Sequence, residues 1–298
     1  MDNPRPMTTP DLPTHDLDAR VADAVRAIRA RTALVPRVGL TLGSGLGGVV
    51  DALDSPTVCP TTELPHWPRS TVHGHAGRFA LGHWEGVPVA ALSGRSHRYE
   101  GYTLDRVTFA VRVMHALGAR TLLFTNAVGA MNPDYAPGDL MLAGDHVNFI
   151  GKRGLFTRRE LAERRAGRAV GTCYSPRLRG ALVEAARRAG VRLHQGTLMG
   201  GLGPSYETAS EVRMASFLGA DVACMSTVHE VMLAAHLGAE VASISCITNR
   251  ATGLSEGPLA HADVTVVADR AAVSLRRILE EFLRGGPGEG PPPLRSAS

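Results

Sequence analysis

The sequence predicts a single α/β domain with a largely buried β-sheet, and three observations support this fold class. Short apolar runs typical of strands alternate along the chain with segments of helical periodicity. Such alternation is typical of sheets that are covered by helices. No linker interrupts residues 16–284, and 44% of the 298 residues are hydrophobic, which suits one large globular core.

The expected elements lie between a disordered N-terminal arm, residues 1–15, and a disordered Gly- and Pro-rich tail, residues 285–298. A first helix follows the arm, and Asp16 or Asp18 can cap its start. Strands are expected at Val38–Leu42, Val87–Leu92, Thr121–Asn126, Leu140–Ala143, Arg192–Leu198, Val222–Met225 and Val241–Thr248. Further helices are expected at Leu104–Leu117, Pro176–Ala189, Ala209–Leu218, Glu230–Leu237 and Asp263–Leu283.

Composition argues against several classes of protein. The chain carries 32 basic and 28 acidic side chains, and the formal charge of 32 − 28 = +4 supplies no basic stripe for nucleic acid. The four cysteines form no C-x-x-C pair, so neither a disulfide scaffold nor a cysteine zinc site is expected. The chain shows no signal peptide and no apolar run that could span a membrane. We therefore expect a cytoplasmic protein without nucleic-acid or membrane partners. Lys152 is its only lysine.

A glycine-rich segment, Gly43–Gly48 (GSGLGG), follows the first expected strand and leads into a helix. The free N–H groups of such a turn suit a phosphate, and Ser44 adds a hydroxyl donor. The string also fits the dinucleotide fingerprint, which needs an acidic residue at the end of a second strand about 20 positions later. Prolines interrupt that stretch, so Glu63 is a poor candidate for a ribose ligand. A tight turn that binds nothing is an equally good interpretation.

The segment Gly94–Tyr102 (GRSHRYEGY) follows another apolar strand. Arginine binds phosphate bidentately, and histidine donates hydrogen bonds to anions or hydroxyls. Arg95 and His97 alternate, so an extended chain places both on one side, whereas Arg98 faces elsewhere as a solvated charge. This cluster favours a functional segment over an ordinary polar loop.

Two further polar segments precede and follow it. His73 and His75 form a His-x-His pair, but no third ligand of suitable spacing follows, so one functional histidine is favoured over a metal site. Two surface histidines are the competing interpretation. The small residues of Thr125–Pro133 (TNAVGAMNP) allow a backbone to approach a ligand closely, or simply form a turn.

Three later segments also follow apolar strands. In Gly200–Thr208, Tyr206 beside Glu207 can stack on a heterocycle and accept its N–H groups, although on local evidence a helix start explains this pattern better. Met225 and Asn249 end the next strands, and His261 precedes the last helix. Because strand ends in α/β sheets converge on one crevice, a ligand site is expected there.

In order and spacing, the motifs GSGLGG, GHAG, GRSHRYEGY, TNAVGAMNP, GPSYETASE, MSTVHE, TNRATG and HADV closely resemble those of the trimeric purine nucleoside phosphorylases that act on 6-oxopurines. The resemblance runs from about Gly39 to Leu283. It implies a central twisted mixed β-sheet flanked by helices, and a homotrimer. It also implies that inosine or guanosine and inorganic phosphate become a free purine and (deoxy)ribose 1-phosphate in purine salvage. Phosphate is then a co-substrate, and neither a cofactor nor a metal is implied.

The resemblance also assigns roles to residues of this chain. It implies that the phosphate site contains Ser44, His75, Arg95, His97, the backbone of Ala127, and Ser226. The ribose site contains Tyr99, Tyr206, Met225 and His261, and the base site contains Glu207 and Asn249. His97, Glu207 and Asn249 are the implied catalytic residues.

The implied chemistry is consistent with cleavage of a glycosidic bond. The ribose resembles an oxocarbenium ion when the C–N bond breaks. Bound phosphate is the nucleophile, and its charge stabilises that cation. Asn249 can stabilise the negative charge of the leaving purine at N7 and O6, while Glu207 holds the N1 side. No paired-carboxylate motif is required.

Some positions depart from the family pattern. Ser96 stands where Phe is common, His229 where Pro is common, and Val128 where a small residue is common. The segment Phe149–Gly171 is divergent. In the family a neighbouring subunit supplies an aromatic side chain from this region, and Phe156 is the nearest candidate.

Three alternatives from the sequence stay open. A 5′-methylthioadenosine phosphorylase shares the implied fold, but that branch places Asp at the position of Asn249, and His261 suits a 5′-hydroxyl. An NAD-dependent dehydrogenase is a second alternative, but the acidic residue that the dinucleotide fingerprint requires at the end of a second strand is missing from this sequence. A catalytically silent nucleoside-binding protein is the third alternative, and the retained Arg95, His97, Glu207 and Asn249 argue against it.

Overall fold

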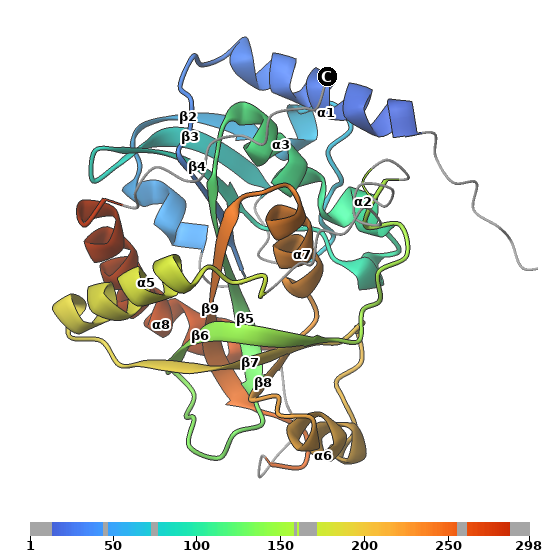
Figure 1. Cartoon of the computed structure of the whole chain (residues 1–298), viewed down its shortest axis with the longest axis vertical. Coiled ribbons are helices and arrows are strands. Elements are labelled where there is room, and N and C mark those ends of the chain that lie inside the picture. Colours follow the sequence, from blue (N-terminus) through green and yellow to red (C-terminus); the bar gives the residue numbers. More distant parts are fainter. Residues whose placement is uncertain are drawn as a thin grey trace, which may run out of the picture.

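The computed structural model of the chain describes residues 14–43, 47–72, 77–157, 160, 172–254 and 261–286. These residues form a mixed β-sheet with helices on both faces, which confirms the predicted fold class (Figure 1). Most of the predicted arm and tail lies outside the described residues. The first helix already begins at Thr14, so the prediction that Asp16 or Asp18 caps it is wrong. Asp16 instead lies in the first turn, where its charge favours the helix dipole.

The strands of the described residues form one sheet in the order β2-β3-β4-β1-β5-β8-β7-β6-β9. The pairs β1–β4, β1–β5, β5–β9, β6–β7 and β7–β8 are parallel, and the other pairs are antiparallel. The strands are β1 (Val38–Leu42), β2 (Asp54–Pro60), β3 (Arg78–Trp84), β4 (Val87–Ser93), β5 (Thr121–Ala130), β6 (Leu140–Asn148), β7 (Leu193–Gly200), β8 (Val222–Cys224) and β9 (Glu240–Arg250).

The second half of the sheet closes on itself. From β5 the pairings run through β8, β7, β6 and β9, and β9 pairs again with β5. β5 has 10 residues and β9 has 11, and the two strands lie parallel over most of their length. Among the described residues, the ring therefore leaves the sheet a free edge only at β2, on its open half.

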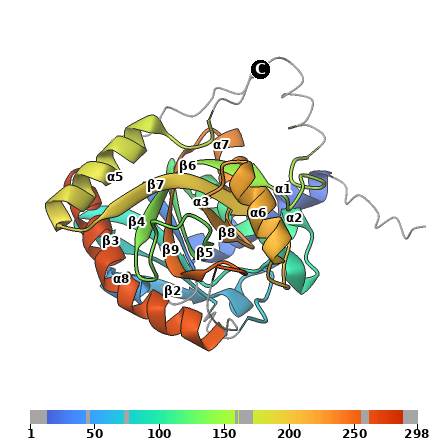
Figure 2. The same cartoon turned by 90° about the horizontal axis from the view of Figure 1, so that it is seen from below.

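The helices form one layer on each face of the sheet (Figure 2). Helices α1, α3 and α7 share one hydrophobic cluster, and α5 and α8 share the other. The helices are α1 (Thr14–Arg29), α2 (Leu104–Val107), α3 (Phe109–Leu117), α5 (Pro176–Ala189), α6 (Ala209–Phe217), α7 (Val228–His236) and α8 (His261–Arg284), with 3-10 turns η1 (Gly47–Ala52), η2 (Thr61–Glu63) and η3 (Arg98–Glu100).

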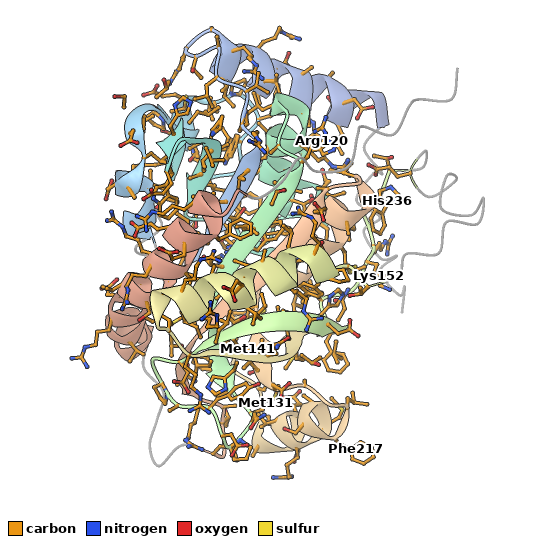
Figure 3. The ribbon with its side chains drawn as sticks, turned by 60° about the vertical axis from the view of Figure 1, so that its left-hand side comes forward. Arg120, Met131, Met141, Lys152, Phe217 and His236 are labelled. Carbon is orange, nitrogen blue, oxygen red and sulfur yellow. The ribbon has the colours of Figure 1, made fainter. Side chains whose placement is uncertain are left out.

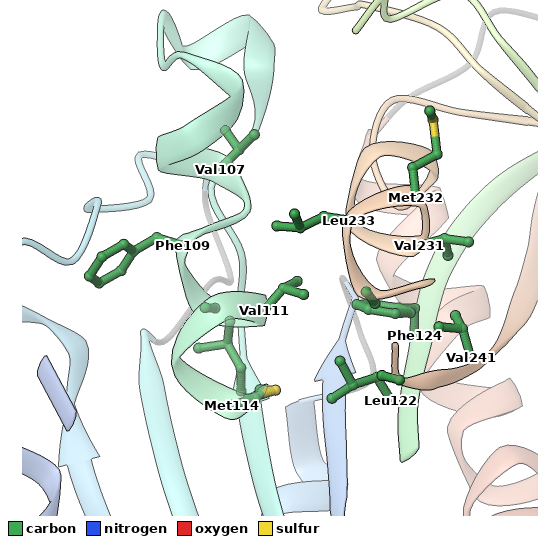
Figure 4. Packing of buried hydrophobic residues seen from close by; sticks show 14 of the residues in the cluster. Val107, Phe109, Val111, Met114, Leu122, Phe124, Val231, Met232, Leu233 and Val241 are labelled. Carbon is green, nitrogen blue, oxygen red and sulfur yellow. The ribbon is translucent and has the colours of Figure 1, made fainter. Parts of the chain in front are cut away.

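Interdigitated apolar side chains hold the first of these layers to the sheet. Figure 4 shows Val111 of α3 and Leu233 of α7 facing one another, with Phe124 of β5 close to α7. All three side chains are buried. Burial of each contributes roughly 1.5–3 kcal/mol. This packing fixes α7 against β5, and both elements carry residues of the site described below.

Several regions differ from the prediction. The glycine-rich segment leads into the 3-10 turn η1 instead of a helix, and α8 already begins at His261, which was expected to precede it. The helix expected over Leu104–Leu117 is interrupted at Thr108, whose hydroxyl donates to the Leu104 carbonyl at 2.7 Å. Such a bond to the preceding turn competes with the helical pattern and bends the backbone. Strands β2 and β3 were not expected, because prolines interrupt the first of them. Proline is tolerated there because β2 lies at the edge of the sheet.

Several large apolar side chains of the described residues are exposed. Figure 3 shows Phe217 projecting from the end of α6, and this side chain is 90% exposed. Lys152 lies in the loop after β6 and is also exposed. No helix within the described ranges is long and apolar enough to cross a membrane.

Candidate active site

The strand ends enclose a cavity of about 420 Å³, a volume typical of small-molecule sites. Its walls come from the ends of β1, β4, β5, β8 and β9 and from the loop after β7. Loops from several strands converge there, as at the ligand sites of other open α/β sheets. Most of the predicted site residues line this cavity, namely Arg95, His97, Tyr99, Ala127, Tyr206, Glu207, Met225, Ser226 and Asn249.

The other predicted residues fall outside what the structure describes. These are Ser44, His75 and the side chain of His261. Gly43, which precedes Ser44, lines the cavity. A Cβ on Gly43 would stand only 2.8 Å from the Asn126 Cα, so glycine is required where the chain leaves β1 beside β5.

Arg95 lies at the buried end of the cavity, and its side chain is only 3% exposed. Its guanidinium forms an ion pair with Glu230 and donates to the Thr227 hydroxyl at 3.0 Å and to the Thr125 carbonyl. Glu230 is equally buried, and burial raises its pKa while the charge of Arg95 opposes that rise. These bonds fix the guanidinium beside the strand ends, where it can face an anion.

His97 is held by a carboxylate that the sequence analysis missed. Glu100 Oε1 lies 3.0 Å from His97 Nδ1 and accepts the His97 backbone N–H at 2.6 Å. Thr71 donates its backbone N–H and its hydroxyl to the other Glu100 oxygen. Burial favours a higher pKa for Glu100, but the bonds from Thr71 and His97 prevail and lower it. The ionised carboxylate therefore orients the imidazole, and the pattern His-x-x-Glu in the sequence was the available signal.

Tyr99 packs against the face of the His97 ring. Its ring stacks on His97, with 4.7 Å between centroids and 14° between planes. Burial and the nearby charge of Glu100 raise the pKa of Tyr99 to about 12. Tyr99 therefore keeps its phenolic hydrogen at neutral pH and can donate it to a ligand. Arg98, expected to be solvated, is instead half-buried and donates to the Tyr102 carbonyl at 2.7 Å.

Glu207, in the loop after β7, and Asn249, near the end of β9, line the same cavity. Burial, together with the charge of Glu211, raises the pKa of Glu207. The Asn249 amide is oriented by two bonds at 2.9 Å, one from the Thr248 hydroxyl to Oδ1 and one from Nδ2 to the Arg250 carbonyl. The local prediction of a helix start is also right, since Thr208 caps α6. The same segment thus starts a helix and lines the cavity.

The β8 end supplies Met225, Ser226 and a buried cysteine. The Cys224 thiol donates to the Ser226 carbonyl at 3.2 Å, and complete burial raises its pKa to about 11. Cys224 therefore stays a thiol at neutral pH and is a poor nucleophile. The Ser226 hydroxyl lies 3.1 Å from that of Thr227.

Asn126 is a second polar residue that the sequence analysis did not single out. Its side chain lines the cavity and is 2% exposed, and neither amide atom reaches hydrogen-bond geometry with a described residue, although the Cys224 thiol lies close enough for the amide to favour the charged form of the thiol. Buried amides are normally paired, and leaving one unpaired costs about 1–3 kcal/mol. Asn126 is therefore suited to bond a polar ligand in the cavity. Its position inside the segment Thr125–Pro133 was the only signal.

Two residues that the sequence suggested for other roles, Glu63 and Phe156, do not line this cavity. Glu63, the acidic residue tested for a dinucleotide site, pairs with Arg31 on the surface and is not part of the cavity wall. Phe156, the candidate for an aromatic contributed to a neighbouring subunit, is buried against His236 with 4.9 Å between ring centroids. Within the described ranges, no group of three or more His, Cys, Asp or Glu residues could hold a metal ion.

Comparisons with known proteins agree with this arrangement. Residues 37–284 match the family model described as the phosphorylase superfamily. Purine nucleoside phosphorylase 1 of Geobacillus stearothermophilus is 39% identical over 264 residues, which are 89% of this chain and 96% of that protein. The purine nucleoside phosphorylase of Rattus norvegicus is 41% identical over 228 residues, 75% of this chain and 79% of that protein.

Solved structures show the same likeness. A Schistosoma purine nucleoside phosphorylase in complex with hypoxanthine has a TM-score of 0.83 and 31% identity, with 91% of this chain and 98% of that chain covered. The Schistosoma mansoni enzyme in complex with inosine has a TM-score of 0.82 and 30% identity, with 89% and 96% covered. The chain therefore belongs to the phosphorylase superfamily and, within it, to the purine nucleoside phosphorylases.

Proposed function

We propose that this protein cleaves purine nucleosides such as inosine and guanosine with inorganic phosphate, giving a free purine and (deoxy)ribose 1-phosphate for purine salvage. The observation that carries the proposal is the convergence of Arg95, His97, Ser226, Glu207 and Asn249 on one cavity in a chain of this family. The cavity volume suits a nucleoside beside an anion.

The buried end of the cavity is the proposed phosphate site. Arg95, His97, Ser226 and the Ala127 backbone line it, and Ser44 and His75 are proposed to complete it from outside the described residues. A guanidinium held by Glu230 is pre-oriented, so little reorganisation is needed when the anion binds. The phosphate then acts as the nucleophile, and no other cofactor is proposed.

The ribose is proposed to lie between that end and the base. Met225, the Tyr99 hydroxyl and the Tyr206 ring are proposed to contact it, with His261 at the 5′-hydroxyl. As the glycosidic bond breaks, the ribose gains positive charge, which the adjacent phosphate stabilises. His97, oriented by Glu100, is proposed to lie between the two ligands, where it could donate a hydrogen bond to either.

The base is proposed to lie between Glu207 and Asn249. The Asn249 amide can donate to a 6-oxo group or to the unprotonated N7, and Glu207 can accept from N1–H. This pairing favours 6-oxopurines over 6-aminopurines. Burial raises the pKa of Glu207, so the ionised carboxylate lowers the stability of the fold. Such a cost is expected of a residue that serves ligand binding.

A spectrophotometric assay tests this function. Inosine and guanosine should be cleaved only when phosphate is present, and adenosine and 5′-methylthioadenosine should react much more slowly. The exposed Lys152, changed by Lys152→Met, provides a control that should leave the rates unchanged. Phosphate-independent cleavage of inosine, or equal rates on adenosine, would contradict the proposal.

We also propose that the protein is a homotrimer. The resemblance to the trimeric class supports this, as does the exposure of Tyr206, which lines the cavity while 44% of its surface faces solvent. Phe156 is not the aromatic residue offered to a neighbour, because it is buried within its own subunit. Light scattering on the purified protein should give three times the chain mass, and a monomer mass would refute the proposal.

A further inference from the structure

The connection from β8 to α7 contains a strained backbone turn. Thr227 has φ 64° and ψ −51°, and the Val228 N–H donates to the Ser226 carbonyl at 2.7 Å. These values define a γ-turn of the rare form with positive φ. A β-branched residue is strongly disfavoured there. Such strain persists only where the surrounding structure holds it in place, and it is most often found at functional sites.

The surroundings of Thr227 hold this turn from several sides. The Thr227 backbone N–H donates to Glu230 Oε2 at 3.2 Å, and its hydroxyl accepts from Arg95 Nη1 at 3.0 Å. Arg95 and Glu230 are themselves an ion pair, and all three side chains are buried. The three residues form a closed cluster behind the cavity wall.

The Thr227 hydroxyl joins two residues that line the cavity. It accepts from Arg95 on one side and lies 3.1 Å from the Ser226 hydroxyl on the other. Thr227 itself is not part of the cavity wall. A hydroxyl has one hydrogen to donate. If Thr227 gives that hydrogen to Ser226 Oγ, the hydrogen of Ser226 is left to point at a ligand.

We propose that Thr227 is a positioning residue of the phosphate site. Its hydroxyl accepts from Arg95 and donates to Ser226, so that the Ser226 hydroxyl acts as a donor toward a phosphate oxygen. The γ-turn brings this hydroxyl between the two residues, which an unstrained strand–helix connection would not do. Donors in such a chain polarise one another, so each bond to an anion is strengthened. This inference rests on the proposed function, because it takes phosphate as the anion.

The test compares two substitutions that differ in the hydroxyl. Thr227→Val keeps the shape and removes the hydroxyl, whereas Thr227→Ser keeps the hydroxyl. With inosine saturating and phosphate varied, Thr227→Val should raise the KM for phosphate roughly tenfold or more. Thr227→Ser should stay within about twofold of the unchanged protein. The KM for inosine, measured at saturating phosphate, should change little in both variants.

A matched control separates positioning from general damage to the core. Thr108 is also completely buried, its hydroxyl donates to the Leu104 carbonyl of α2, and it is not part of the cavity wall. Thr108→Val should therefore lower stability while leaving the KM for phosphate unchanged. If Thr227→Val does not fold, Thr227→Ala removes the same hydroxyl with less strain and is measured instead.

The outcomes separate this inference from the proposed function. An unchanged protein whose activity does not depend on phosphate refutes the proposed function. If the activity depends on phosphate but Thr227→Val has the same KM for phosphate as the unchanged protein, only the role of Thr227 is refuted. Equal impairment of Thr227→Val and Thr227→Ser also refutes it, because the hydroxyl would then not be the group that matters.

Discussion

His229 gives the most quantitative prediction about this protein. It lies in the first turn of α7, beside the Thr227 turn, and is only 1% exposed. Burial, and then the positive charges of Arg95, His97 and Arg98, lower the pKa of His229 to about 3, from 6.5. Nδ1 of its ring has no partner among the described residues, so no acceptor there favours the charged form. Replacement by methionine, His229→Met, removes the titration and keeps a buried side chain of similar size.

The sign of the effect follows from proton linkage. Below about pH 6.5 the unfolded chain takes up a proton on His229, whereas the folded protein does not until about pH 3. Acid therefore favours unfolding, and stability falls as the pH drops through this window. Each pH unit costs about 1.4 kcal/mol, so the loss at about pH 5 is about 2 kcal/mol. Above about pH 7.5 the group is neutral in both states and contributes nothing to the pH dependence.

Urea unfolding at about pH 7.5 and about pH 5 measures this difference. Between the two pH values, His229→Met should lose about 2 kcal/mol less stability than the unchanged protein. The exposed His83, changed by His83→Met, should lose as much as the unchanged protein does. Other histidines such as the half-buried His115, whose pKa burial lowers to about 4, cancel in the comparison. A loss in His229→Met equal to that of the unchanged protein would refute the argument.

Three further predictions concern the site and the core. Asn249→Asp replaces a donor to a 6-oxo group by an acceptor for a 6-amino group. The kcat/KM for inosine divided by that for adenosine should therefore fall about 100-fold, and an unchanged ratio would refute this account of specificity. Glu207→Gln removes a carboxylate whose pKa is raised by burial, so its melting temperature should exceed that of the unchanged protein by a margin that grows as the pH rises above about 4.5. The KM for inosine should increase in the same variant. Glu160→Ala leaves the buried Arg112 without its paired carboxylate, now at 2.7 Å, and should cost about 3–5 kcal/mol in urea unfolding without changing the KM for phosphate.

The fold was predictable where the signals are local. Helix α5 has the bounds that the sequence predicts, because Ser175 caps its start and Gly190 ends it in the left-handed conformation. The break at Thr108 was not predictable, because the apolar spacing continues across it and only a side-chain bond interrupts the helix. β2 was missed because proline argues against a central strand, and the sequence does not say which strand lies at an edge.

The candidate site was likewise predictable only in part. Its residues could be found because each follows an apolar strand, and strands that end together bring their loops together. Their supporting partners could not be found in this way. Arg95 and Glu230 are 135 residues apart, so no spacing in the sequence connects them. The strain at Thr227 was equally hidden, because Thr227 is the N-cap of α7, as its position suggests, and a cap residue normally has an extended backbone rather than a positive φ.

The edge strand β2 has a consequence for how copies of this chain can meet. Among the described residues, β2 offers the sheet's one free row of backbone groups, which is the kind of edge on which another molecule can add a strand and start a polymer. Pro56 and Pro60 remove two N–H donors from that row, and the pairing with β3 is irregular between Asp54 and Thr57. Strand-by-strand growth is thereby discouraged. Association of copies in solution is left to helices and loops, where it can end at a defined number of subunits.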